Sequence, residues 1–387
     1  MIKANGRSAV KSTEIEEYNK KLALLYRVGQ KVSLGSQVSK LLGQISLMTR
    51  QTLHASAASV LLVDKGREEL CFEVAQGKAG KVLKKMKLTV NSGITGWVAR
   101  QGKPLMVNDV TMDRRFNKDV DRVTGFATKS MLAVPLVSER SVIGVIEVLN
   151  KVDGSGFNKQ DLEVLVALAS TAAIAISNAR LHQEIVDGHK NTVKALAAAV
   201  DARDPHTCGH SERVTKYALL GGISLSLPEE DLEVIEYAGM LHDIGKIGVS
   251  DTILCKPSHL TNEEWTIMYQ HPEMGAKIIN GVPFLEKAKR LVLYHHERYD
   301  GKGYPEGLAG QDIPIGARLL AIADAFDTMT TDRSYRAAPG IDYALSELYK
   351  CSGTQFCPVA VEAFVSRLKT PGAFAQSDLE ALPISHR

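Results

Sequence analysis

The chain has 387 residues, 44% of them hydrophobic, and a formal net charge of +3, which describes an ordinary globular protein and argues against a basic nucleic-acid-binding surface. At roughly 100–200 residues per domain, this length predicts two folded units joined by a connector. The five cysteines include no CxxC pair, so neither a disulfide framework nor a zinc ribbon is expected.

The N-terminal residues 1–23 are charged and lack the apolar core of a secretory signal, so we expect a helical extension of a cytoplasmic protein. Apolar residues at helical spacing, for example Leu25 and Val28, continue to about residue 53. The longest stretch of low polarity, residues 164–176, is shorter than the ~20 residues that cross a bilayer. No membrane-spanning segment is therefore expected.

Residues 24–185 are expected to form an α+β domain. Five segments within it are short, rich in Val, Leu and Ile and bounded by Gly, Asn or Asp, which predicts strands: residues 57–63, 70–75, 103–107, 131–137 and 142–149. Because helical segments flank these strands, we expect helices to cover one face of a mainly antiparallel sheet.

A helix without proline is predicted over residues 158–200, and the first domain, residues 24–185, ends within this connector helix. Its apolar residues alternate between spacings of three and four: Leu162, Leu165, Ala169, Ala172, Ile176, Ala179, Val186 and Val193. Near the sheet, this seam fits a helix packed on its own domain as well as a contact between subunits. Beyond Leu181 a two-stranded coil is favoured, which predicts a homodimer through this connector helix.

The remainder, residues 200–370, is helical with Pro and Gly turns and is expected to be all-α, with a tail over residues 371–387. Imidazoles and carboxylates recur in this half: His210, His242, Asp243, His271, His295, His296 and Asp324. Such ligands without thiolates suit iron, manganese or zinc, and two ions that share a carboxylate can activate water and hold a phosphate. The pattern therefore predicts a metal-dependent hydrolytic site.

Both carboxylates stand in apolar helical surroundings, Asp243 in YAGMLHDIGKIG and Asp324 in LLAIADAFDTM. Burying either acid costs several kcal/mol unless a cation compensates it, so a metal ion is the expected partner. Lys246, three residues after Asp243, is expected on the same helix face, where it can touch a phosphate oxygen. The adjacent His295 and His296 would point roughly 100° apart on a helix, which favours two ions over one.

Six stretches of the second half carry a family signature: HSERV (210–214), LHDIGKI (241–247), ILCKPSHLTNEEW (253–265), HPEMGAKII (271–279), HHERYDGKGYPEGL (295–308) and RLLAIADAFDTMTTDRSYR (318–336). Together they resemble the HD-GYP family of HD phosphohydrolases. The resemblance implies hydrolysis of cyclic di-GMP, to pGpG and/or GMP, at a centre of two or three ions, typically iron or manganese. It also implies that the imidazoles and carboxylates named above are metal ligands, with Asp243 as the bridge.

The resemblance assigns further roles in this half. Asp243 and Lys246 are the implied catalytic residues, and Lys246, Arg333 and Arg336 are implied to bind substrate phosphates. The turn Gly303-Tyr304-Pro305 fits contact with the substrate or with a partner such as a diguanylate cyclase that carries a GGDEF domain. A plain turn that caps the preceding helix is the alternative.

One position differs from the commoner family patterns. His206 lies four residues before His210, where relatives with a third metal carry Glu and many others carry an aromatic residue. On one helical turn the two imidazoles would face the same way. A third ion and a hydrogen-bonding role both fit His206, so the number of ions stays open.

Residues 93–109 (GITGWVARQGKPLMVND) and 131–151 (MLAVPLVSERSVIGVIEVLNK) resemble stretches of a GAF domain. Four residues follow the Asn-Lys-Phe-Asp-Glu pattern of GAF domains that bind cyclic nucleotides: Asn150, Lys151, Phe157 and Asp161. Leu162 stands where that pattern has Glu. The domain is expected either to sense a small molecule through these four residues or only to dimerise.

The leading hypothesis is a cyclic di-GMP phosphodiesterase that its GAF domain regulates. The alternatives are an HD phosphohydrolase for another nucleotide, such as a hybrid cyclic dinucleotide, and a non-catalytic receptor or adaptor. A connector helix over residues 158–200 with no Pro and few Gly can transmit a displacement, and Gly188 is its weak point.

Overall fold

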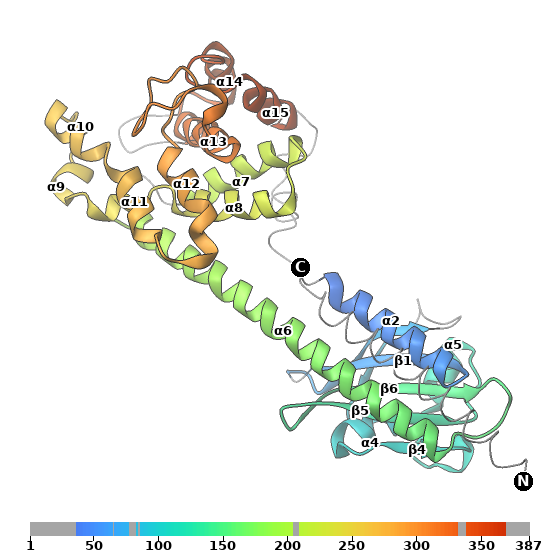
Figure 1. Cartoon of the computed structure of the whole chain (residues 1–387). Coiled ribbons are helices and arrows are strands. Elements are labelled where there is room, and N and C mark those ends of the chain that lie inside the picture. The colour runs from blue at the N-terminus through green and yellow to red at the C-terminus, as the bar shows by residue number, and fades with distance from the viewer. Residues whose placement is uncertain are drawn as a thin grey trace, which may run out of the picture. The chain divides into compact units, whose positions relative to one another are not determined.

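The computed structural model describes residues 36–64, 66–76, 83, 86–203, 209–331 and 338–368. The chain divides into two compact units, Met1–Val186 and Asp187–Arg387, and each is described by itself (Figure 1). The expected helical extension over residues 1–23 and the expected tail over residues 371–387 lie outside the described residues.

The first unit contains a six-stranded sheet, and its neighbouring strands are antiparallel in the order β3-β2-β1-β6-β5-β4. The strands are β1 (Ala55–Asp64), β2 (Glu69–Gln76), β3 (Lys87–Thr89), β4 (Leu105–Val107), β5 (Met131–Ser138) and β6 (Ser141–Lys151). The helices before the connector are α2 (Ser36–Thr52), α4 (Gly93–Gln101), the 3₁₀ turn η1 (Val110–Met112) and α5 (Lys118–Thr124). The predicted antiparallel sheet is confirmed.

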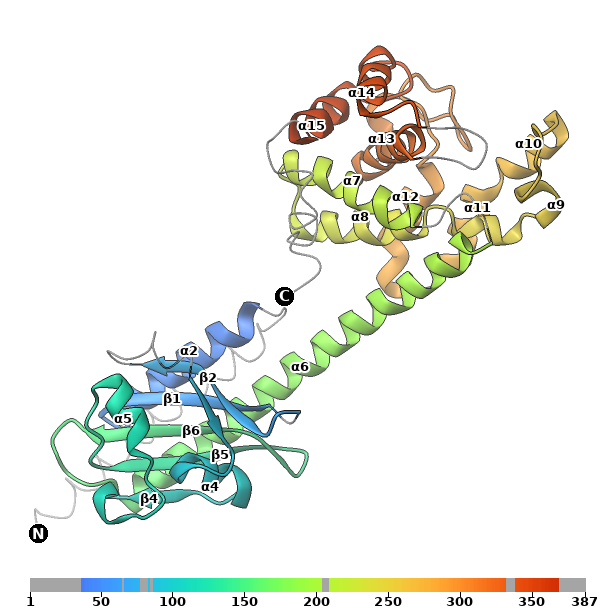
Figure 2. The ribbon, with the colours of Figure 1, turned by 180° about the vertical axis from the view of Figure 1, so that it is seen from behind.

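Helices pack on both faces of this sheet, whereas we expected them on one face only. On one face, α2 and the start of α6 (Lys159–Asp201) bury residues such as Leu42 and Leu165. Helix α4 lies on the other face (Figure 2), and its Ile94 packs in a second cluster. The cause lies in the strands, since β1 presents Val60 to the first cluster and its neighbour Leu61 to the second. Both faces of the sheet are therefore apolar and need a cover.

Helix α6 packs with its first part on the sheet of its own unit. Leu165, Ala169, Ala172 and Ile176 are at most 1% exposed in that core, so this part of the predicted seam is a contact within the domain. Among the described residues, α6 is long and apolar enough to cross a membrane by length and composition, because the helix continues beyond the predicted stretch 164–176. The packing of its first part on the sheet also explains why α6 is so apolar, since those residues are buried in the core.

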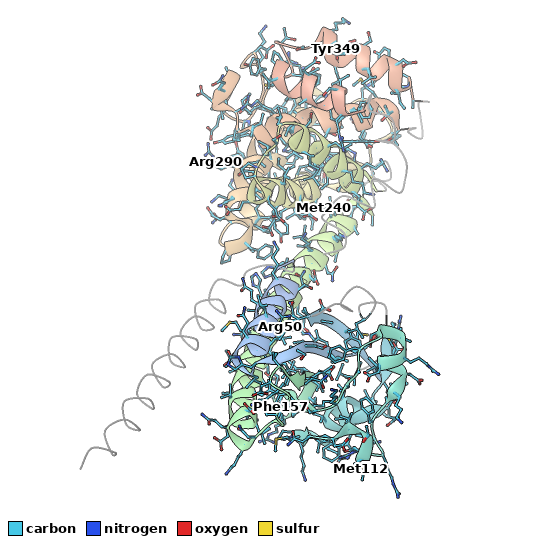
Figure 3. The ribbon with its side chains drawn as sticks, turned by 90° about the vertical axis from the view of Figure 1, so that its right-hand side faces the viewer. Arg50, Met112, Phe157, Met240, Arg290 and Tyr349 are labelled. Carbon is cyan, nitrogen blue, oxygen red and sulfur yellow. The ribbon has the colours of Figure 1, made fainter. Side chains whose placement is uncertain are left out.

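The second unit consists of helices around one core, and its described residues contain no β-strand. Its helices are α7 (His210–Ser224), α8 (Glu229–Leu241), α9 (Asp251–Leu254), α10 (Asn262–Met268), α11 (His271–Ile279), α12 (Glu286–Tyr294), α13 (Ile315–Thr330), α14 (Ile341–Lys350) and α15 (Pro358–Leu368). The 3₁₀ turns are η2 (Ile244–Gly248), η3 (Pro283–Leu285) and η4 (Gly310–Asp312). Phe326 of α13 and Phe364 of α15 belong to the core. Met240 of α8, which Figure 3 labels, also belongs to it. The all-α prediction is confirmed.

Candidate metal centre

Helix ends place most of the predicted ligands. His210 begins α7, His271 begins α11, and His295 follows the last residue of α12. The expected helix through Asp243 is wrong, because α8 ends at Leu241 and the 3₁₀ turn η2 follows. Most of the candidate ligands therefore project from helix ends that lie close together, rather than from the middle of one helix face.

Turn η2 lies against α11 because Gly245 has no side chain. A Cβ atom on Gly245 would lie 1.8 Å from the His271 carbonyl oxygen and 2.6 Å from the Gly275 amide nitrogen. Only glycine fits at this distance, so the close approach that brings Asp243 to His271 depends on it.

The structure brings the seven predicted ligand residues together in two groups around a carboxylate. His210, His242 and Asp324 form one group and His271, His295 and His296 the other, and within each group the candidate ligand atoms lie within 4.8 Å of one another. In the first group, His210 Nε2 is 3.3 Å from Asp324 Oδ1. In the second, the Nε2 atoms of His271 and His295 are 3.3 Å apart.

Asp243 lies between the two groups. Its Oδ2 is 3.4 Å from His242 Nε2 and 3.9 Å from His210 Nε2, while its Oδ1 is 3.4 Å from His271 Nε2. One carboxylate oxygen therefore faces each group, which is the arrangement that a carboxylate shared by two cations needs.

Backbone carbonyls fix which imidazole nitrogen faces the centre. The Nδ1 atoms of His242, His271 and His295 lie 2.7–2.8 Å from the carbonyl oxygen three residues earlier and must donate to it. Each Nε2 therefore keeps its lone pair and is free to bind a metal ion. His242 Nε2 is buried and has no hydrogen-bond partner among the residues that the structure describes, which is costly unless a cation binds it. The residues present fit a metal centre.

Asp327 orients His210, and sequence reasoning missed it. Its Oδ2 lies 2.8 Å from His210 Nδ1, and Arg213 donates to both oxygens, from Nε at 2.6 Å and from Nη2 at 3.0 Å. The spacing held the signal, because Asp327 follows Asp324 by three residues on α13 and Arg213 follows His210 by three on α7. This carboxylate-histidine pair aims His210 Nε2 at Asp324.

Two family models match the chain, the HD domain over residues 194–358 and the GAF domain over residues 37–176. The chain thus joins a GAF domain to an HD domain. These domains coincide with the sheet-containing unit and the helical unit, and the resemblance recognised from the motifs is confirmed at this level.

The HD domain has curated relatives whose names describe phosphodiesterases. The chain is 40% identical over 184 residues to the cyclic di-GMP phosphodiesterase response regulator RpfG of Xanthomonas campestris pv. campestris, covering 47% of this chain and 49% of that protein. It is 35% identical over 226 residues to the 3'3'-cGAMP-specific phosphodiesterase 2 of Vibrio cholerae, covering 58% and 43%. It is 41% identical over 165 residues to the cyclic di-GMP phosphodiesterase of Thermotoga maritima, covering 42% and 45%. The chain spans about half the length of the curated relatives it matches, or less.

Burial and charge set the protonation of the HD-domain site. Burial and the neighbouring imidazoles lower the pKa of His296 to about 3 and that of His295 well below its usual range, so both are neutral at pH 7. Burial would raise the pKa of Asp243, but Lys246, whose Nζ lies 2.7 Å from Oδ2, and the surrounding histidines hold it well below its usual value. Burial opposes protonation of His210, yet the Asp324 and Asp327 carboxylates raise its pKa to about 10. A cation beside His210 would take the place of that proton.

The predicted turn Gly303-Tyr304-Pro305 lies against the candidate metal ligands. The Tyr304 ring stacks on His296 with centroids 4.9 Å apart and an interplanar angle of 28°. A Cβ atom on Gly303 would lie 2.3 Å from the Arg298 amide nitrogen, so this turn requires glycine. Glu297, which we did not predict, is buried and accepts hydrogen bonds from the amides of Glu306 and Gly307 at 2.8 and 3.0 Å. The turn is thus fixed beside the candidate ligands.

Three predicted site residues of the HD domain cannot be placed. His206, Arg333 and Arg336 lie outside the described residues, so the third-ion position and the two phosphate contacts stay predictions.

The four residues predicted to bind a GAF ligand make contacts within the polypeptide. Asn150 accepts hydrogen bonds from the Lys129 and Ser130 amides, at 2.7 and 3.0 Å. Lys151 pairs with Asp161 at 2.7 Å. Phe157 is 3% exposed in the core beside α6 (Figure 3). None of the four occurs among the described residues that line a cavity beside helices α4 and α5.

That cavity has a volume of about 780 Å³, counting the part open to solvent. It lies between the sheet and helices α4 and α5 and is mostly apolar, with Phe72, Ile94, Phe116 and Leu149 among its lining residues. Glu147 of β6 reaches into it from the sheet, is 5% exposed, and accepts a hydrogen bond of 2.6 Å from the Thr95 hydroxyl. Burial raises the pKa of Glu147 to about 7. The signal was a lone acid in the apolar strand VIGVIEVL.

Proposed function

We propose that the HD domain is a metal-dependent phosphodiesterase that hydrolyses cyclic di-GMP. The observation that carries the proposal is the position of Asp243, with one oxygen towards each of two groups of ligand atoms. Two divalent ions, iron or manganese by family resemblance, would be held by His210, His242 and Asp324 on one side and by His271, His295 and His296 on the other, with Asp243 between them.

When bound, such ions supply Lewis acidity towards a phosphate and activate water for attack on phosphorus. The chain's own residues hold and orient that chemistry. The carbonyl-bound imidazoles present fixed Nε2 lone pairs, and Lys246 Nζ beside Asp243 can offset negative charge on a phosphoryl oxygen. Opening one ester of the ring gives pGpG, and opening both gives GMP.

The test compares metal content and turnover in one set of samples. Anaerobically purified protein should contain iron or manganese and convert cyclic di-GMP to pGpG or GMP, and Asp243→Ala should lose both the metal and the activity. Asp342→Asn, an exposed acid on α14, is the matched control and should keep both. Metal-loaded protein that binds cyclic di-GMP but leaves it intact would make the chain a receptor and end the proposal.

A second substrate is favoured by one relative. The Vibrio cholerae protein that matches 58% of this chain is named as specific for 3'3'-cGAMP. A hybrid cyclic dinucleotide therefore belongs in the assay beside cyclic di-GMP, and the ratio of the two kcat/KM values decides between them.

We also propose that the GAF domain binds a small molecule and regulates the HD domain. The support is the cavity with Glu147 at its wall, since a mostly apolar pocket that also has polar side chains suits a small ligand with an apolar body and a hydrogen-bond donor. Because the predicted set of Asn150, Lys151, Phe157 and Asp161 makes structural contacts, we place the ligand at Glu147. Hydrolysis rates of the full chain with and without candidate amines test this.

We further propose a homodimer through α6. On the described part of this helix, Ile174, Leu181 and Ile185 are 63%, 50% and 55% exposed and follow at spacings of seven and four. This spacing keeps the three on one stripe, which suits a two-stranded coil. Light scattering should give twice the chain mass, and Leu181→Glu should give a monomer.

A further inference from the structure

A row of aromatic rings leads from the metal centre to the surface of the HD domain. Tyr304 stacks on His296 at 4.9 Å. Tyr269 follows, 4.5 Å from Tyr304, with an interplanar angle of 45°. Trp265 ends the row, 5.4 Å from Tyr269 and nearly parallel to it at 28°. Two of these rings, Trp265 and Tyr269, have no role in the function described so far.

The outer rings are not part of the hydrophobic core. Trp265 is 41% and Tyr269 45% exposed, and helix α10, which carries Trp265, has no buried residue. Core packing therefore does not explain why large aromatic side chains stand here.

Helix α10 is nevertheless held firmly. Thr261 and Glu264 form a capping box at its start, and Lys256 pairs with Glu264 at 2.5 Å. A short helix fixed by a cap and an ion pair, with its rings left in solvent, presents those rings to something else.

We propose that Trp265 and Tyr269, continued by Tyr304, form a stacking platform for a purine base of the substrate. The inference rests on the proposed function, because the base meets the row when a phosphate of the same nucleotide is held at the metal centre. In a cyclic dinucleotide each base is one sugar away from a phosphate, and the row begins at His296, a candidate metal ligand. Exposed aromatic faces bind nucleobases by stacking, with little preference for sequence.

The row favours a base over a protein partner on that surface. A surface that binds another protein needs no contact with the candidate metal ligands. These rings, however, contact one another in an unbroken row as far as His296. Stacking of one base contributes on the order of 10- to 100-fold in affinity.

Fluorescence can test this without turnover, because Trp97 and Trp265 are the chain's two tryptophans. Trp97→Phe in the full chain leaves Trp265 as the reporter. GMP and pGpG should quench Trp265 in a saturable way, whereas ribose 5-phosphate, which has the phosphate and no base, should not. Equal effects of GMP and ribose 5-phosphate would overturn the platform.

Steady-state kinetics supply the second arm. Trp265→Leu, which keeps apolar bulk and removes the ring, should raise KM for cyclic di-GMP about 10-fold or more with little change in kcat, and Trp265→Phe should largely restore KM. Ile267→Ala, on the same helix and 39% exposed, is the matched control. Unchanged KM in Trp265→Leu, or a change of particle mass without a change of KM, makes the surface a protein contact and refutes the platform. If no hydrolysis occurs but GMP quenches Trp265, the proposed function fails while the platform stands.

Discussion

Asp327 acts through His210, which makes its contribution measurable apart from direct metal binding. The carboxylate fixes the His210 ring and increases the basicity of Nε2, and Arg213 holds the carboxylate in turn. Asp327→Asn should lower metal affinity or kcat about 10- to 100-fold, the usual effect of such an orienting partner. Asp312→Asn, an exposed acid on η4, is the control. Wild-type metal binding and kcat in the Asp327 variant would contradict this role.

The raised pKa of Glu147 predicts how the stability of the GAF domain depends on pH. Its pKa is about 7 in the folded protein, against an ordinary value of 4.5, so the folded state binds the proton more tightly. The contribution of the protonated Glu147 carboxyl to folding stability is fully present below pH 4.5 and is lost as the pH rises through 7. The Glu147→Gln side chain stays neutral. Above pH 7.5, the free energy of unfolding of this variant should therefore exceed that of the wild type by about 3 kcal/mol, and the difference should vanish near pH 4.5.

Urea unfolding at several pH values measures this difference. Trp265→Phe in both backgrounds leaves Trp97 on α4 as a reporter of the GAF domain. Parallel stability curves for the wild type and the Glu147→Gln variant across this pH range would mean that the carboxyl is not protonated in the fold.

The same residue-scale argument from sequence gave a prediction for one acid and was not applied to another. Asp243 stands in an apolar stretch of the sequence, and this context alone predicted a compensating cation. Glu147 stands in an equally apolar strand and received no prediction. Asp327 lies in the same apolar helix as Asp324 and also received no prediction; its partner His210 lies 117 positions away in the chain, and the fold brings the two together.

At the scale of elements, the contact between η2 and α11 depends on one missing side chain. Gly245→Ala would place a Cβ atom 1.8 Å from the His271 carbonyl oxygen, and backbone on both sides must then shift. We expect a loss of about 1–3 kcal/mol or more in the free energy of unfolding and a loss of bound metal, because Asp243 moves away from His271. Gly43→Ala in α2, where a Cβ meets nothing within 4 Å, should be neutral or stabilising. Equal stability and metal content in both variants would contradict the close approach.

Periodicity predicted long elements well and short ones poorly. The strands β1, β5 and β6 follow from continuous runs rich in Val, Leu and Ile, and the helix α6 follows from apolar spacing of three and four. Strand β3 has only Lys87–Thr89, too short for a pattern, and it was missed. The end of α8 at Leu241 was also missed, because LHDIGKIG continues the apolar helical spacing while the contact of Gly245 with α11 imposes a 3₁₀ turn.

At the scale of the whole molecule, α6 is the covalent path between the GAF domain and the HD domain, and it contains residues of both units. Gly188 lies on it seven residues after Leu181, so it continues the exposed stripe that we assign to the dimer. A helix in this position can transmit a rotation between domains only while its register is kept.

Inserting residues after Gly188 tests that transmission. One inserted residue turns the HD domain by roughly 100° relative to the stripe, so the hydrolysis rate and its response to a GAF ligand should change. Seven inserted residues bring the HD domain back to within about 20° of its starting rotation about the helix axis. They should restore the hydrolysis rate and its response to a GAF ligand, although the helix becomes longer. Light scattering on each protein shows whether the dimer persists. If the one-residue and seven-residue insertions behave alike, helix phase carries no signal and the GAF domain acts on the HD domain by another route or not at all.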